Sequence, residues 1–372
     1  MAGQRFSRRW LLVAAGAAAI VGVSAVQLPA AALDVDAEAL RRCIRAEVPP
    51  YVGYAEASGR LGLPEIPQLE SVTTLLTTTT RIRSYVAGAD RWRADQLTGA
   101  LGDSERDTYH LGAAEYVWDF GGNQLTRVLG QAPLRLPRAG DLLPPDLARR
   151  MLGLAPGDPV TAIPARRIAG RDAAGIRLVP TDPDTTVGRV DIWADPTTAL
   201  PLRVEIAART GPTLLVSELL EVTDGPPDPA VLRPVVPPGA GAVTASAADL
   251  SGALRDLRAP PAPARLAGRA RLTLPSTPGS DLPGVGVYGT GLAGFVLIPT
   301  GRDVADRAVD GATAAGGTAI PVPFGRAARI GTPLLSVAVR STGRRGSLLI
   351  GTVAADVLQQ ALLELPARGR PS

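Results

Sequence analysis

The sequence predicts an α+β protein with two domains, the larger of which is built on an antiparallel β-sheet. Its 372 residues include 41 glycines and 35 prolines, which indicates many turns between short strands rather than long helices. Residues 188–206 show the clearest pattern: apolar and polar side chains alternate on both sides of Asp195-Pro196, as in a hairpin with one apolar face. A proline-, alanine- and glycine-rich stretch at 236–265 marks a linker. We therefore expect a large domain over 33–235 and a smaller α+β domain over 266–372.

Composition and charge argue against several kinds of function. The net charge is only +4, every basic residue is an arginine, and no basic run is flanked by aromatics, so no nucleic-acid partner is expected. Cys43 is the only cysteine and His110 the only histidine. These counts exclude an intramolecular disulfide, a cysteine metal cluster and a histidine-rich zinc site. We predict no metal and no cofactor, and we interpret Cys43 as a small apolar residue on a helix face.

Residues 1–32 have the features of an export signal. Arg5, Arg8 and Arg9 precede an uncharged run at 10–26, and an Ala-x-Ala pattern ends at Ala32. Residues 7–12 also resemble a twin-arginine signal. Two alternatives follow for residues 10–26: a leader that is cleaved after Ala32 or Ala25, or an uncleaved anchor in the cytoplasmic membrane. Both place the protein outside that membrane.

The large domain is expected to open with helical segments. Asp36 caps a predicted helix over 37–46, Pro49-Pro50 ends it, and a strand follows over 51–63. Between 64 and 80, apolar residues recur at helical spacing, at Leu69, Val72, Leu75 and Leu76. This second helix has two interpretations: it plugs the core, or it forms a lid over an apolar cavity.

Short strands separated by glycines make up the rest of the large domain. They are predicted over 80–86, 90–96, 107–111, 116–120 and 124–128, which is the spacing of an antiparallel meander. A helix is expected over 144–152, and strands resume at 160–168, at 175–180, in the hairpin of 188–206 and at 213–222. The linker is predicted to contain a short helix over 250–257, and the small domain strands over 284–288, 294–299, 333–339 and 347–353. A helix over 354–365 closes it.

Both halves of the chain resemble the RseB/MucB family of extracytoplasmic regulators, whose large domain shares the fold of LolA and LppX. In the large domain the resemblance is carried by 168–171, 176–180, 190–195 and 200–203. The blocks 91–93, 107–109 and 117–119 are also similar to lipoprotein-carrier-like proteins of actinobacteria. In the small domain it is carried by 287–293, 295–299 and 349–353. The chain departs from the family in lacking a clear Gly-Ala-Met/Val-Asn element, to which 325–330 is only an approximation.

The resemblance implies a large, curved antiparallel sheet, an open half-barrel wrapped over helices, with an apolar cavity between them. In this fold Leu200, Leu202, Val204 and Ile206 should face the helices, and Arg203 and Glu205 should face water. Trp92, Trp118 and Trp193 lie on predicted strands and either line the cavity or belong to an ordinary core. The candidate cavity residues are Leu69, Val72, Leu76, Trp92, Trp118, Ile192, Leu202 and Val204.

Three motifs that look catalytic or ligand-binding have simpler interpretations. Residues 289–294 spell G-x-G-x-x-G, but a strand and a proline follow where a dinucleotide site needs a helix, which favours a hairpin turn. Asp182, Asp184 and Thr186 begin like a calcium loop that then lacks its glycine and glutamate. Asp103, Glu105 and Asp107 are expected to be solvated turn carboxylates, and His110 a satisfied or solvent-facing side chain rather than a ligand or pH sensor.

Three functions are weighed on this basis. The first is a non-enzymatic regulator that takes an acyl chain or a lipoprotein in the cavity and, as the resemblance implies, binds the extracytoplasmic domain of an anti-sigma factor in envelope-stress signalling. The second is a lipid or lipoprotein carrier of the LolA/LppX type without a regulatory partner. The third, a hydrolase, is disfavoured because His110 is the only base for a serine nucleophile and no nucleophile–base pair is visible. No catalytic residue is predicted.

Overall fold

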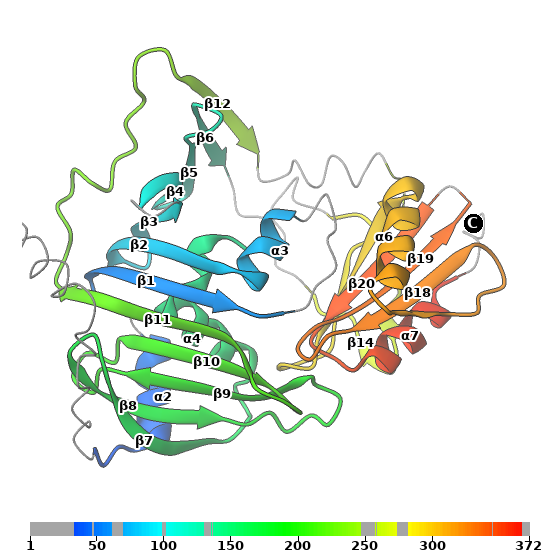
Figure 1. Ribbon diagram of the computed structural model, residues 1–372, viewed down its shortest axis with the longest axis horizontal. Helices are drawn as coiled ribbons and strands as arrows, with labels where there is room; N and C mark the ends of the chain where they lie inside the picture. Colours follow the sequence, from blue (N-terminus) through cyan, green and yellow to red (C-terminus); the bar gives the residue numbers. More distant parts are fainter. Residues whose placement is uncertain are drawn as a thin grey trace, which may run out of the picture.

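A computed structural model describes residues 33–46, 48–61, 70–98, 102–129, 135, 137–246, 257, 259–273, 282–343 and 345–366. The predicted export signal and the linker helix, apart from Leu257, lie outside these residues. Within them the chain forms one large and one small β-sheet, each packed with helices, which lie side by side (Figure 1).

The large sheet has 12 strands in the order β12-β6-β5-β4-β3-β2-β1-β11-β10-β9-β8-β7 and does not close into a barrel. Neighbouring strands are antiparallel, except that β12 runs parallel to β6. The strands are β1 Tyr51–Gly59, β2 Thr79–Gly88, β3 Arg91–Thr98, β4 Asp103–Leu111, β5 Ala114–Asp119, β6 Gln124–Leu129, β7 Val160–Ile168, β8 Arg171–Leu178, β9 Val187–Ala194, β10 Pro201–Ala208, β11 Thr213–Asp224 and β12 Gly241–Ser246.

Helices cover one face of this sheet, which we call the helix face. They are α2 Ala37–Ala46, α3 Glu70–Thr77, the 3-10 helix η2 Ala139–Leu142 and α4 Pro144–Leu154. Apolar residues of α2 and α4, such as Ile44 and Leu152, are fully buried against the sheet. A curved sheet wrapped over helices is the predicted fold, and the prediction is confirmed.

The predicted hairpin of 188–206 is formed by β9 and β10. Asp195 shapes the turn, because its Oδ1 accepts hydrogen bonds from the amides of Thr197 at 2.8 Å and Thr198 at 3.2 Å. The predicted register is also confirmed. Leu200, Leu202, Val204 and Ile206 are at most 6% exposed and belong to the core under the helices. The guanidinium of Arg203 instead binds Glu205 at 2.8 Å on the opposite face.

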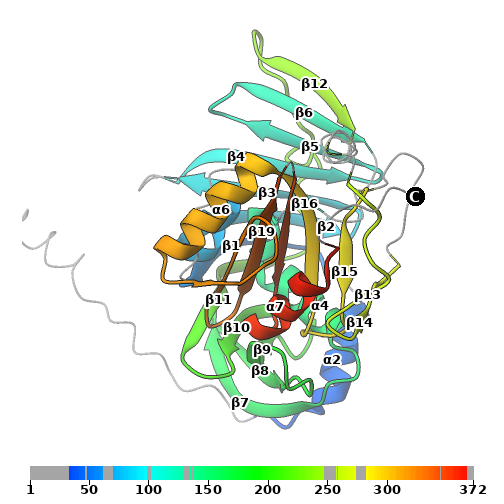
Figure 2. The same ribbon diagram turned by 90° about the vertical axis from the view of Figure 1, so that its right-hand side faces the viewer.

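The small sheet has six strands in the order β15-β16-β20-β19-β18-β17, with one helix on each face (Figure 2). We call these faces the α6 face and the α7 face. The elements are the two-stranded ribbon β13 Arg265–Leu266 and β14 Arg269–Ala270, then β15 Gly286–Tyr288, β16 Phe295–Gly301, α6 Arg302–Ala314, β17 Thr318–Ala319, β18 Arg326–Gly331, β19 Ser336–Thr342, β20 Arg345–Gly351 and α7 Ala355–Glu364. The motif at 289–294 is the turn between β15 and β16, as predicted.

A loop of the large unit, residues 181–186, joins the two units. Its backbone forms an antiparallel bridge between Thr185 and Val353, and the amide of Thr186 donates to the carbonyl of Thr352 at 3.0 Å. The hydroxyl of Thr186 donates to the carbonyl of Leu334 at 2.6 Å. The two units therefore share a continuous hydrogen-bonded junction. None of the helices that the structure describes is long and apolar enough to cross a membrane.

Candidate ligand-binding site

Three of the predicted cavity residues are packed in the core. Ile192, Leu202 and Val204 are each 0% exposed and belong to the apolar cluster beneath α2 and α4. In this half of the sheet the helices fill the helix face, so these three side chains contribute stability rather than an open lining.

The other predicted residues lie in the half of the sheet formed by β3–β6 and β12, which we call the wing, or next to it. Trp92 lies on the helix face, and the partly buried Leu76 packs against the apolar core of the large unit. Trp118 lies on the opposite, outer face, where it clusters with Tyr109 and Leu125. Leu69 lies outside the described residues, and Val72 belongs to α3 without a described side chain. The structure therefore does not bring the eight residues together.

A cavity of about 660 Å³ lies on the helix face of the wing, between strands β3–β6, helix α3 and the start of η2. We call it the wing cavity. Leu75 and Ala139 close it from the helical side, and Val117 and Ala94 provide apolar floor. Its remaining lining is largely neutral and polar, from Gln96, Thr108, Gln124 and Thr126. Such a mixture suits a ligand that has both apolar and hydrogen-bonding parts.

Every charged side chain that lines the wing cavity has a polar partner, and Glu105 accepts a hydrogen bond from Gln96 at 3.1 Å. Arg106 Nη2 binds Asp119 Oδ2 at 3.1 Å, and Arg138 pairs with Glu115. The backbone amide of Gly122 and the Arg106 guanidinium lower the pKa of the Asp119 carboxyl. Because these charges neutralise one another, the cavity has no strong preference for an anion or a cation.

A smaller cavity of about 330 Å³ lies next to Tyr51 and Trp92, below η2 and the first half of α4. Asp141 holds its wall together, because it accepts hydrogen bonds from Arg135 at 2.6 Å and 2.7 Å and from Arg150 at 2.7 Å. Burial acts to raise the pKa of Asp141, but the Arg135 guanidinium and the other donors hold it below its usual range. Arg135 and Arg150 are therefore paired with Asp141 and stabilise the wall of this cavity.

His110 is a packed aromatic side chain. Its ring stacks on Trp92 with ring centroids 5.4 Å apart, and burial lowers the pKa of its imidazole. Among the described residues, no group of three or more histidine, cysteine, aspartate and glutamate side chains could hold a metal ion.

The prediction that Asp107 is a solvated turn carboxylate is wrong. Asp107 lies within β4 and is 2% exposed, whereas Asp103 and Glu105 at the start of the same strand are exposed. On the outer face Arg93 binds both Asp95 at 2.5 Å and Asp107 at 2.8 Å. The segment that follows β11 covers this cluster, because the carbonyl of Val231 accepts a hydrogen bond from Arg93 at 3.2 Å.

This buried charge cluster was not found from the sequence, although its signal is present. The run 90–96, DRWRADQ, places Arg93 and Asp95 on the same face of a strand. Burial raises the pKa of the Asp95 carboxyl to about 7, and the nearby Asp107 adds to this effect while Arg93 opposes it.

Comparisons with known proteins find similarity in structure only. No protein-family model and no curated protein matches the sequence. The Pseudomonas aeruginosa MucA/MucB complex contains a chain that matches with 16% identity and a TM-score of 0.46, covering 88% of this chain and 95% of that chain. A LolA superfamily protein from Nitrosomonas europaea matches with 13% identity and a TM-score of 0.25, over 54% of this chain and 99% of its own. Mycobacterium tuberculosis LppX matches with 12% identity and a TM-score of 0.27, over 50% and 94%.

The predicted resemblance to MucB and to LolA and LppX is confirmed by these matches. No TM-score among them reaches 0.5, so the function must be inferred from the residues of this chain.

Proposed function

We propose that this chain is an exported, non-enzymatic protein that senses a lipid or lipoprotein and regulates the extracytoplasmic domain of an anti-sigma factor. The observation that carries the proposal is the wing cavity, an opening of about 660 Å³ beneath a sheet whose other half is packed against α2 and α4. The export signal expected in residues 1–32 would bring the protein to the compartment where such ligands occur.

The chemistry of the wing cavity supports an amphipathic ligand. Leu75, Val117 and Ala94 offer apolar contacts, and the side-chain amides of Gln96 and Gln124 offer donors and acceptors without net charge. A lipid with an acyl chain and a polar head, or a peptide that carries an acyl chain, has both an apolar part and a hydrogen-bonding part. A ligand without an apolar part would leave the apolar lining exposed to water.

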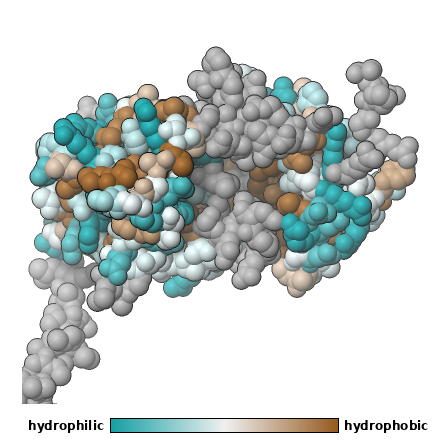
Figure 3. Space-filling model, turned by 90° about the horizontal axis from the view of Figure 1, so that it is seen from above, coloured by the Kyte–Doolittle hydropathy of each residue, from teal (hydrophilic) through white to brown (hydrophobic). Residues whose placement is uncertain are grey.

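The connection between the wing and the second unit supports a regulatory role. Strand β6 lines the wing cavity through Gln124 and Thr126, and along its whole length it pairs with β12. β12 is also the last strand of the large sheet before the chain enters the second unit. A ligand that shifts β6 would thereby act on the segment that leads to the second unit. On the side that Figure 3 shows, hydrophilic residues gather on part of the second unit, which suits a transient partner better than an obligate one.

Native mass spectrometry of residues 33–372 after gentle purification tests the sensing function. We expect a co-purified lipid or lipopeptide, and its loss from a Val117→Trp variant, in which an indole fills the wing cavity. Val179→Trp is the matched control, because Val179 is 43% exposed after β8, far from the wing in the strand order, and should accept the larger side chain without effect. A protein that remains empty when lipids are added would refute the proposal.

The alternative function, a carrier of the LolA/LppX type, shares the wing cavity and differs in the partner. A pull-down from membranes with the ligand-free protein distinguishes the two. Capture of an anti-sigma factor that is released when lipid is added supports regulation. Transfer of lipid between vesicles without any captured partner supports the carrier and contradicts regulation.

A further inference from the structure

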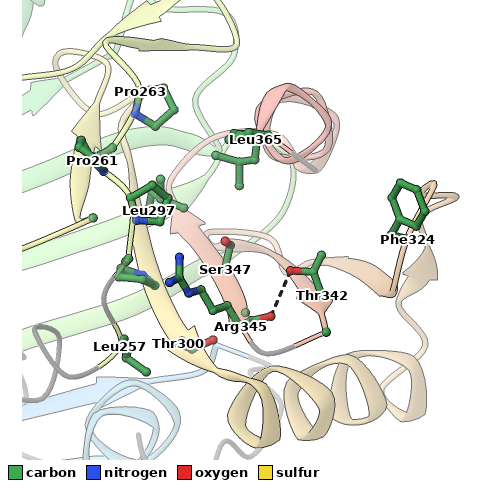
Figure 4. A pocket seen from close by; sticks show the side chains of 18 residues that line it. Leu257, Pro261, Pro263, Leu297, Thr300, Phe324, Thr342, Arg345, Ser347 and Leu365 are labelled. Atoms are coloured by element: carbon green, nitrogen blue, oxygen red, sulfur yellow. Dashed lines mark hydrogen bonds between the residues drawn. The ribbon is translucent and has the colours of Figure 1, made fainter. Parts of the chain in front are cut away.

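The second unit contains a cavity of about 550 Å³ that is separate from the wing cavity. It lies on the α7 face of the small sheet, between β16, β20, the end of α7 and the segment 259–263 (Figure 4). Leucine and proline side chains form much of its walls, among them Pro261, Pro263, Leu297, Pro299 and Leu365. A largely apolar, concave site of this size can hold a small molecule.

The walls of this cavity are fixed by hydrogen bonds. The Tyr288 hydroxyl donates to the carbonyl of Pro263 at 2.7 Å, and Arg271 Nη1 donates to the carbonyl of Ala262 at 2.7 Å. The Tyr288 ring stacks on Phe295 with centroids 5.2 Å apart, and both side chains are almost completely buried. Hydrogen bonds therefore hold the proline-rich segment 259–263 against the sheet before any ligand enters. Binding then costs less conformational entropy, because the segment is already ordered.

The described polar residues of the cavity include arginine but no acid. Arg345 and Ser347 lie on the same face of β20, and the Arg345 side chain extends into the space between Thr300, Ser347 and Leu297 (Figure 4). No aspartate or glutamate is among the lining residues in the part of the chain that the structure describes.

A second, buried arginine adjoins the same cavity. Arg340 pairs with Ser347 across β19 and β20, and its Nη1 donates to the carbonyl of Leu365 at 3.0 Å. Both neighbours line the cavity, so the Arg340 guanidinium lies directly behind its wall. The residue is 4% exposed, and its Nε and Nη2 bind none of the described residues.

Among the described residues that line the cavity, no carboxylate balances these two arginines. Arg340 and Arg345 are diagonal neighbours on one face of the sheet, where like charges repel. A buried cation without a counter-ion is unfavourable, and burial lowers the pKa of the Arg340 guanidinium. Arginine pairs well with a carboxylate because its planar fork matches the two oxygens.

We propose that this cavity is a binding site for an amphiphilic monoanion with a carboxylate head and an apolar body, such as a long-chain carboxylate. Arg345 binds the head directly, Arg340 stabilises its charge from behind the wall, and the leucines and prolines bury the apolar body. The site is distinct from the wing cavity and does not depend on the function proposed for it.

Titration of the full chain with dodecanoate, followed by the carbonyl signal of the 13C-labelled carboxylate in NMR, tests the site. With the wing cavity closed by Val117→Trp, we expect saturable binding, at least tenfold weaker binding when Arg345→Gln is added, and none when Ser347→Trp is added, because its indole fills the cavity. Arg302→Gln is the matched control, because Arg302 is an exposed arginine in the same unit and does not line the cavity. Val117→Trp should also bind dodecanoate normally, since it changes only the wing cavity.

Two comparison ligands test the role of each part of the anion. Dodecanol, which has the chain without the charge, and acetate, which has the charge without the chain, should both bind at least tenfold more weakly than dodecanoate. Equal binding of dodecanol would overturn the role of the arginines. Loss of dodecanoate binding in Val117→Trp but not in Ser347→Trp would place the ligand in the wing cavity and overturn the site. Circular dichroism of each variant shows whether it is folded.

Discussion

The hydroxyl of Thr185 in the large unit lies 2.6 Å from the carbonyl oxygen of Leu292 in the second unit. The same hydroxyl is 3.0 Å from the carbonyl of Thr352 and accepts a hydrogen bond from the amide of Val187 at 3.2 Å. Thr185 is 2% exposed, so these bonds are shielded from water. One side chain therefore couples the loop 181–186 to two turns of the second unit.

Replacing Thr185 by valine should weaken the coupling between the two units. The substitution keeps the shape but removes the hydroxyl, and we expect a loss of about 1–3 kcal/mol in the free energy of unfolding. In residues 33–372 the tryptophans are Trp92, Trp118 and Trp193, all in the large unit, so fluorescence of this part reports on the large unit, whereas circular dichroism reports on both units. In urea the two signals should coincide for the wild type and separate for the variant.

Thr181→Val provides the control for this experiment. Its hydroxyl binds Asp158 at 2.7 Å within the large unit and does not contact the second unit. Coincident transitions in Thr185→Val would show that this hydroxyl does not couple the units.

The stability of the protein should decrease as the pH rises from 4 to 7 because of Asp95. Its pKa is about 7 in the folded protein, against about 3.9 in an unfolded chain. Between these values the folded state holds a proton that the unfolded state has released, so the stabilisation is complete below pH 4 and lost as the pH passes 7. The expected slope is at most about 1.4 kcal/mol per pH unit.

Asp95→Asn should remove this dependence, because the amide keeps the shape and does not titrate. Urea unfolding at several pH values measures the slope. Asp103→Asn is the matched control, since Asp103 is exposed on the next strand. If wild type and Asp95→Asn show the same slope, the buried cluster does not hold the proton.

Leu202→Ala should cost about 2–5 kcal/mol of stability, as expected when a fully buried leucine is truncated. Leu202 is 0% exposed beneath the helices, whereas Leu220 on β11 is 42% exposed. Leu220→Ala should therefore change the stability by less than about 0.5 kcal/mol. Chemical denaturation measures both. A cost below about 1 kcal/mol for Leu202→Ala would mean that this side chain lines an open space.

Gly59→Ala should push α3 away from β1. A Cβ atom at Gly59 would lie 2.2 Å from the backbone oxygen of Leu76, which cannot move without the helix. We expect a loss of about 1–3 kcal/mol, as for other overpacked sites. Hydrogen exchange at the amide of Leu61, which donates to the Leu76 carbonyl at 3.1 Å, should become faster.

Gly153→Ala is the control for the added methyl group. Gly153 lies in α4, and a Cβ atom added there would meet nothing within 4 Å. Alanine also favours a helix by about 1 kcal/mol over glycine, so this variant should be at least as stable as the wild type. Unchanged exchange at Leu61 in Gly59→Ala would show that α3 is not held by this contact.

The elements that were predicted from the sequence are those whose side chains alternate strongly. In β10, Leu202 and Val204 point to the core, and Arg203 and Glu205 point away from it. Apolar and polar residues therefore alternate along the sequence of this strand. Helix α6, Arg302–Ala314, was missed because its buried residues are small: Ala305, Val309 and Ala312 give a weak apolar stripe. β12, Gly241–Ser246, was missed because its residues are mostly small and show no clear alternation of apolar and polar side chains.

The candidate site could be predicted only in part, because alternation assigns residues to two faces without telling what covers each face. Trp118 was assigned to the cavity, yet it lies on the outer face near Ala240 of the segment that follows β11. Both faces of the wing are therefore partly buried. The polar lining of the wing cavity, such as Gln96 and Thr126, looks in the sequence like an ordinary solvated face.

The pairing of β1 with β11 sets the order in which the large sheet can be completed. Tyr51 pairs with Asp224 and Gly59 with Leu215, so the middle of the sheet joins parts of the chain that are far apart in sequence. β1 can pair with β2 as soon as β2 has been synthesised. Its other edge stays unpaired until β11 has also been synthesised. Long-range pairings of this kind form slowly. During synthesis or export the free edge of β1 is therefore the part of the chain that most needs a chaperone.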